Sequence, residues 1–132
     1  MSNQAEHKAF IFNEKIDKEL LISLYEDDFL YMEEIFSITL TQLKPDIIHL
    51  NSAFEAADLS TLQKAVHKIK PSFGFVGLPL TQELCKRFED ACAAASSVEQ
   101  LASAYAELCN QLNESVTIIE SEHGKFKEYN QS

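Results

Sequence analysis

Hydrophobic residues recur at alternating steps of three and four along most of the 132-residue chain, which predicts an almost entirely helical protein. The longest such stretch covers about residues 28–56. Pro45 falls inside it, and its missing N–H predicts a kink or break there. Asp58 is placed to cap the next helix, Gly77 to end that helix, and Gly124 to end the last one.

The remaining helices follow from the same periodicity. A short first helix is expected over about residues 14–25, with Ile16, Leu20 and Leu24 as its apolar stripe. A third helix should bury Leu62, Val66, Ile69 and Phe73. A fourth, over about residues 80–95, should bury a stripe formed by Leu80, Leu84, Phe88, Ala91 and Ala95. The last helix begins near Val98.

Four long amphipathic helices joined by short connections predict an all-α fold, an up-down antiparallel four-helix bundle with a short additional N-terminal helix. The length suits one domain over residues 1–132, and we expect an ordered core at about residues 14–123 with flexible termini. Bundles serve many functions, so the function must come from a site.

Composition narrows the class of protein. The formal net charge of −10 and a pI of about 4.7 argue against binding to nucleic acid or to anionic membranes. No membrane span or signal peptide is apparent, so we expect a cytoplasmic protein. We also expect it to be a monomer. The odd number of cysteines and the absence of a C-x-x-C pair indicate neither a disulfide framework nor a zinc site; the cysteines are Cys85, Cys92 and Cys109.

One histidine stands out against this acidic background. His67 should lie on the water-facing side of the third helix, because it is far from the centre of the apolar stripe. Lys64 and Lys70 lie one turn away on the same side, and Gly74 lies two turns on, where it would clear the approach to the ring. The surrounding run, Leu59–Gln82, contains three lysines and no acid.

This arrangement suits covalent phosphorylation of the imidazole. A histidine with an ordinary pKa near 6.5 is largely neutral at cytoplasmic pH, so one ring nitrogen can attack a phosphorus atom. A lysine aimed at the transferring group stabilises its spread negative charge. Lys70 is best placed for this role, and Lys64 and Lys68 are the next candidates. Ser72 could donate a hydrogen bond.

The run His67-Lys68-Ile69-Lys70-Pro71-Ser72, followed by Gly74 and Gly77, resembles the signature of histidine-containing phosphotransfer (HPt) domains of multistep two-component relays. The resemblance covers nearly the whole chain. It implies that His67 accepts the phosphoryl group, that Lys70 supports it, and that Gly74 and Gly77 let a receiver domain dock.

The same resemblance implies a phosphocarrier, not an enzyme, whose partners are response-regulator receiver domains and a hybrid sensor histidine kinase. No cofactor is expected on this chain, and Mg²⁺ should belong to the receiver. The sequence departs from the signature at Phe73, where many members carry a small residue. Phe75 should face outward and could contact a docked receiver. The basic window predicts association rates that depend on salt.

Other functions compete with this interpretation. A non-catalytic adaptor bundle would also have long helices and an acidic exterior, but it would have no use for His67 and Lys70. A metal site could recruit His7, His49 and His123, although His49 has no H-x-x-x-H or E-x-x-H partner and the other two lie near the chain ends. A phosphatase would need a second catalytic group near His67, and the nearest acids in sequence, Asp58 and Glu83, are more than two turns away.

Overall fold

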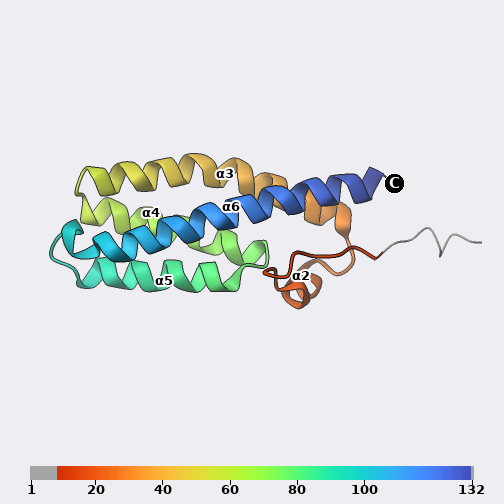
Figure 1. The fold of residues 1–132 in the computed structure, drawn as a ribbon, viewed down its shortest axis with the longest axis horizontal. Coiled ribbons are helices and arrows are strands. Elements are labelled where there is room, and N and C mark those ends of the chain that lie inside the picture. Colours follow the sequence, from red (N-terminus) through yellow and green to blue (C-terminus); the bar gives the residue numbers. More distant parts are fainter. Residues whose placement is uncertain (1–8, 132) are drawn as a thin grey trace, which may run out of the picture.

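The chain folds as a helical bundle in the computed structural model, which describes residues 9–131 (Figure 1). These residues form α2 (Lys18–Tyr25), α3 (Phe29–Glu55), α4 (Leu59–Phe75), α5 (Pro79–Ala94), a short 3₁₀ helix η1 (Val98–Leu101) and α6 (Ala102–Gln131). Around the bundle, α3 packs on α4, α4 on α5, α5 on α6, and α6 on α3. The predicted all-α, four-helix architecture is therefore confirmed.

Aspartates begin three of the helices. Asp17, Asp28 and Asp58 each accept a hydrogen bond from the backbone N–H three residues further on, at 3.0, 2.9 and 3.1 Å. Such a side chain satisfies one of the N–H groups that the first helical turn leaves without a partner. The capping role expected for Asp58 is confirmed.

The turn after α4 depends on a glycine. Gly77 has a φ of +77°, in the left-handed region that side chains rarely adopt. A Cβ at this position would also lie 3.0 Å from both Ile16 and Leu21. The predicted end of the helix at Gly77 is confirmed, and the same glycine lets the N-terminal part of the chain pack closely against the turn.

Two expected interruptions do not break a helix. α3 continues without a break through Pro45. α6 continues through Gly124 to Gln131, so the predicted end at Gly124 is wrong. A glycine inside a helix costs only about 1 kcal/mol relative to alanine, and packing of the following turn can exceed that. Phe126 supplies such packing, because its side chain is fully buried.

The helical stripes are confirmed in α4, where Leu62, Val66, Ile69 and Phe73 are all fully buried. In α5 Phe88 is buried as predicted, but the rest of the buried face is shifted. Leu80 is 81% exposed, and the other buried residues of α5 are Thr81, Cys85 and Cys92. A buried threonine is tolerated there because its hydroxyl lies 2.8 Å from the Ser115 hydroxyl of α6.

The first helix also differs from its prediction. Ile16 precedes α2 and is buried, Leu21 is the buried residue within α2, and Leu24 is about half exposed. The predicted stripe failed because the chain is still irregular at Ile16, so the helical spacing does not extend back to that residue.

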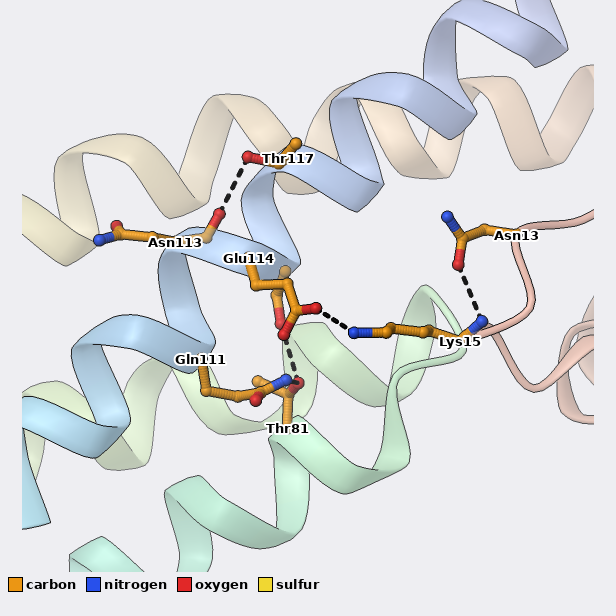
Figure 2. Close-up of polar contacts among 8 residues, drawn as sticks. Asn13, Lys15, Thr81, Gln111, Asn113, Glu114 and Thr117 are labelled. Atoms are coloured by element: carbon orange, nitrogen blue, oxygen red, sulfur yellow. Dashed lines mark hydrogen bonds and ion pairs between the residues drawn. The ribbon is translucent and has the colours of Figure 1, made fainter.

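The N-terminal segment crosses α6 before it enters α2. Figure 2 shows Lys15 extending from this segment to Glu114 of α6, with which it forms an ion pair. The N–H of Asn13 donates to the buried carboxylate of Glu122 at 3.1 Å. Phe10 stacks on Phe126 with ring centroids 4.5 Å apart. These contacts bring the segment to the turn at Gly77.

The N–H of Asp17 then donates to the carbonyl of Gly77 at 2.8 Å. α2 consequently lies beside the connection between α4 and α5, at the end of the bundle where α3 and α6 reach farther than their neighbours (Figure 1). Within residues 9–131, no helix combines the length and the apolar character that crossing a membrane requires.

Candidate functional site

His67 lies on the outer side of α4, and its side chain is 66% exposed, in agreement with the predicted position. Its Nδ1 atom lies 2.7 Å from Oε2 of Glu89, which comes from the neighbouring helix α5. An ionised carboxylate can only accept, so Nδ1 carries the proton in this contact. In the neutral ring the lone pair is therefore on Nε2, the nitrogen available to a partner.

Glu89 also accepts from Lys70. The Lys70 ammonium donates to Oε1 of Glu89 at 2.7 Å, so one carboxylate contacts both residues of the predicted pair. Only 17% of the Glu89 side chain is exposed. The hydrogen bond from Lys70, assisted by that from His67, holds the pKa of Glu89 below its ordinary value, although partial burial acts in the opposite direction.

A buried thiol lies close to this ion pair. Burial raises the pKa of Cys85 to about 12, and the nearby charges of Lys70 and Glu89 act on it in opposite directions. Cys92, one helical turn beyond Glu89, has a pKa raised to about 11 by burial. Both cysteines are therefore neutral, apolar packing residues at ordinary pH.

The window without acids does not form an unpaired basic surface. Lys68 donates to Asp46 of α3 at 3.1 Å, and Lys70 is paired with Glu89 of α5. Lys64 is exposed one turn before His67. Because the neighbouring helices supply the missing acids, the local positive field is weaker than the sequence window suggested.

The approach beside His67 is only partly open. Gly74 is half-buried, and a Cβ there would lie 2.9 Å from the side-chain oxygen of Gln82 on α5. The glycine thus leaves room for the tip of Gln82 rather than empty space, which corrects the expected clearance. Gly77 is buried beneath the turn, so it forms no part of an accessible docking surface.

Phe75 lies on the surface and is 53% exposed, as predicted. Its carbonyl accepts a hydrogen bond of 2.7 Å from the hydroxyl of Tyr25 in α2. The ring of Tyr25 packs edge-on against Tyr31 of α3, at 5.5 Å between centroids. Aromatic side chains from three helices therefore lie close to the end of α4. Ser72 is half-buried on the same helix.

Glu89 and Gln82 are the residues that reading the sequence alone missed. In the antiparallel hairpin of α4 and α5, Leu78 lies midway between His67 and Glu89 in sequence, and also midway between Gly74 and Gln82. The sequence predicts the end of α4 at Gly77, so counting outward from the adjacent Leu78 locates both contacts. Distance along the chain is a poor guide here, because Glu89 reaches the ring from the neighbouring helix.

The alternative metal site gains no support from the described residues. Among residues 9–131, no group of three or more histidine, cysteine, aspartate or glutamate side chains is arranged to hold a metal ion. His49 and His123 lie in α3 and α6, respectively. His7, the third histidine considered, falls outside the described residues.

Comparisons with known proteins agree on the class of the chain. The family model described as "Hpt domain" matches residues 34–121. Among solved structures, the HPT domain from the Hpt sensor hybrid histidine kinase of Shewanella matches with a TM-score of 0.73 and 21% identity, covering 84% of this chain and 95% of that one. No match was found among curated proteins.

The fold is that of an HPt bundle. The exposed His67 lies on α4, the helix that carries the run resembling the HPt signature. The chain belongs to the Hpt domain family. Membership implies histidine phosphotransfer within two-component phosphorelays, with receiver domains as partners. Hpt domains act as intermediates in such transfer.

Proposed function

We propose that this protein is a histidine phosphocarrier that accepts a phosphoryl group on Nε2 of His67 from a phospho-aspartate receiver domain and passes it to another receiver. The observation that carries the proposal is the contact between Nδ1 of His67 and Glu89, on a ring that is 66% exposed. This contact fixes the tautomer and directs the Nε2 lone pair toward solvent, where a partner can meet it.

Lys70 has the supporting role in this proposal. Its ammonium lies on the same carboxylate as the imidazole and is 24% exposed, so it is close to the ring but still reachable from solvent. Negative charge spreads over the phosphoryl oxygens during transfer, and a neighbouring cation stabilises it. Lys64, Lys68 and Ser72 are more distant members of the proposed phosphoryl surroundings.

The receiver would dock across the exposed side of α4. Phe75 offers an apolar contact, and Tyr25, which donates to its carbonyl, also packs against the exposed Tyr31. Because Gly74 and Gln82 are half-buried, they add little bulk to the surface beside the imidazole. Gly77, which was expected here, instead shapes the turn beneath. Low relief around a nucleophile allows a large partner to bring its phosphoaspartate close to the ring.

The remaining parts of the proposal follow the family. The chain carries phosphoryl groups without generating them, and Mg²⁺ belongs to the receiver's aspartate pocket. A hybrid sensor histidine kinase would supply the first receiver. We also propose that the protein acts as one monomeric domain in the cytoplasm.

Phosphotransfer from a phosphorylated receiver tests the proposal directly. Wild type should gain an acid-labile, alkali-stable label, whereas His67→Gln should gain none, because glutamine has no nucleophilic nitrogen. His49→Gln is the matched control, since His49 is exposed on α3 and should not take part. Labelling of His67→Gln at the wild-type rate would refute the assignment.

A further inference from the structure

We propose that Glu122 is a positioning residue for receiver docking: its buried carboxylate fixes the N-terminal strap (residues 10–17) on α6, and the strap holds α2 in place beside Phe75 at the end of α4. This inference rests on the proposed function, in which a receiver docks across α4. The strap and α2 precede residue 34, where the match to the family model begins.

Glu122 occupies a position in α6 where an apolar residue would be expected. It lies one turn after Ile118 and one turn before Phe126 on the buried face of the helix, and it is itself fully buried. Its Oε2 accepts the Asn13 N–H at 3.1 Å, and its Oε1 pairs with the Lys125 ammonium at 2.7 Å. Replacing a buried ion pair by apolar side chains of similar size is often neutral or stabilising, so stability alone does not explain this glutamate.

The hydrogen bond to Glu122 sets where the strap crosses α6. Asn13, the donor, also begins a tight turn, in which its carbonyl accepts from the Ile16 N–H at 3.0 Å and its side-chain oxygen accepts from the Lys15 N–H at 2.8 Å (Figure 2). The strap also has stacked rings and an exposed ion pair with α6. Those contacts tolerate a shift along α6 more readily, because a shift would leave the buried carboxylate without its donor.

The turn leads the strap to the end of α4. Ile16 is buried against Gly77, and the Asp17 N–H donates to the Gly77 carbonyl at 2.8 Å. The Asp17 carboxylate then caps α2. At the other end of α2, the Tyr25 hydroxyl donates to the Phe75 carbonyl at 2.7 Å. Both ends of α2 are thus attached close to the end of α4.

Packing within α2 does little to fix its position. Leu21 is its buried residue, whereas Ile22 and Leu24 are 36% and 49% exposed. A helix of eight residues is also too short to be stable by itself. Glu26, which follows α2, has a φ of 57°, so the chain bends there and does not continue α2 into α3. The position of α2 therefore depends on the strap.

A shifted strap should affect docking and not the chemistry at the imidazole. A receiver that covers Phe75 would also meet α2, so a displaced α2 would weaken its binding. His67 lies about two turns before Phe75, and its ring contacts Glu89 of α5, with no contact to the strap among those described. Loss of the Glu122 contact should thus raise the receiver concentration needed for transfer and leave the limiting rate unchanged.

The test compares Glu122→Leu and Glu122→Gln with wild type. Leucine fills the space but cannot accept from Asn13, whereas glutamine keeps an accepting oxygen. Single-turnover transfer from a phosphorylated receiver is followed over a range of receiver concentrations. We expect the half-saturating concentration for Glu122→Leu to rise about fivefold, on the scale of one lost hydrogen bond, with the limiting rate unchanged. Glu122→Gln should lie close to wild type.

Glu120→Leu is the matched control. It places the same substitution on the same helix, at an exposed carboxylate that pairs with Lys44 of α3 and not with the strap, so it should behave like wild type. Phosphoramidate, a small donor that needs no docking surface, should label His67 at the same rate in all of these proteins.

Two results would overturn the inference while leaving the relay role intact. One is a half-saturating concentration for Glu122→Leu equal to that of wild type. The other is an equal rise in Glu122→Gln, which would mean that the bond from Asn13 is not the cause. Failure of wild type to take label from a phosphorylated receiver would refute the relay role itself.

Hydrogen exchange in wild type covers the case in which Glu122→Leu does not fold. If a receiver binds better when the strap is attached, the strap must detach less often in the complex. The N–H groups of Asn13 and Asp17 should then exchange about fivefold more slowly when an unphosphorylated receiver is bound. That of Ala95, at the opposite end of α5, should not change. Unchanged exchange at Asn13 and Asp17 in the saturated complex would contradict the proposed role of Glu122.

Discussion

At the scale of single residues, the site consists of His67, Lys70 and Glu89, contributed by two helices. The sequence identifies the first two because they are one turn apart on one helix, where spacing fixes their relation. Glu89 lies 22 positions from His67, and no local pattern links it to the ring. Its contact depends on the register between α4 and α5, which follows only from the position of the intervening turn.

Replacing Lys70 should reveal its contribution to the rate of phosphoryl transfer. In Lys70→Ala the transferring phosphoryl group loses its nearest cation, so we expect transfer from a phosphorylated receiver to slow by about tenfold or more. Time courses of labelling measure this rate. Lys86→Ala provides the comparison, because Lys86 is an exposed lysine of α5 that pairs with Asp90. Equal rates in Lys70→Ala and wild type would remove Lys70 from the mechanism.

At the scale of elements, hydrophobic spacing correctly predicts that helices exist and how they follow one another. It fails on the buried face of α5 because Thr81 is inside and Leu80 is outside. The Thr81 hydroxyl is satisfied by Ser115 and by the side-chain amide of Gln111, which donates to it at 3.1 Å (Figure 2). A polar residue that finds its partners on another helix cannot be recognised from the pattern of one helix.

The two glycines that were expected to end helices should respond oppositely to alanine. Gly77→Ala forces a side chain into a left-handed backbone and against Ile16 and Leu21, so it should lower the free energy of unfolding by about 1–3 kcal/mol. Gly124→Ala should raise it by up to about 1 kcal/mol, because Gly124 lies inside α6 and a Cβ there meets nothing within 4 Å.

Urea unfolding curves of both variants and wild type give the comparison. A Gly77→Ala protein as stable as wild type would show that the turn tolerates a side chain, contrary to the geometry. Destabilisation by Gly124→Ala would contradict the continuous helix through that residue.

At the scale of the whole molecule, the bundle is predictable because four amphipathic helices with short connections have few ways to bury their apolar faces. The charges are harder to predict. The sequence shows an acidic chain with a basic window, whereas the fold supplies Asp46 and Glu89 to the lysines of that window. The neutralised surface depends on contacts between helices, which composition does not reveal.

These carboxylates should make the molecule sensitive to acid. The pKa of Glu89 lies below its ordinary 4.5 because of Lys70, and that of Asp58 lies below 3.8 because of its capping hydrogen bonds. Each ionised carboxylate stabilises the folded state in full when the pH is above its ordinary pKa. This stabilisation is lost as the pH falls through the lowered pKa of the folded protein. Urea unfolding as a function of pH should therefore show stability falling below about pH 4.5.

The contribution of Glu89 can be separated from that of other acids. Glu89→Gln cannot titrate at this position, so its stability should fall less steeply over the same range of pH. Glu83→Gln should follow wild type. A Glu89→Gln curve as steep as that of wild type would mean that the ion pair adds nothing to folding.

The turn at Gly77 has a consequence for how this chain can vary in length. If the turn and the start of α5 kept their form, one residue inserted after Pro79 would rotate the following side chains of α5 by about 100° relative to α4. Glu89 would turn away from the imidazole, although the histidine, the lysine and the glutamate would all be unchanged. A deletion would have the same effect in the opposite sense. The number of residues between this turn and Glu89 is therefore a functional property of the protein, as much as the identity of any residue in the site.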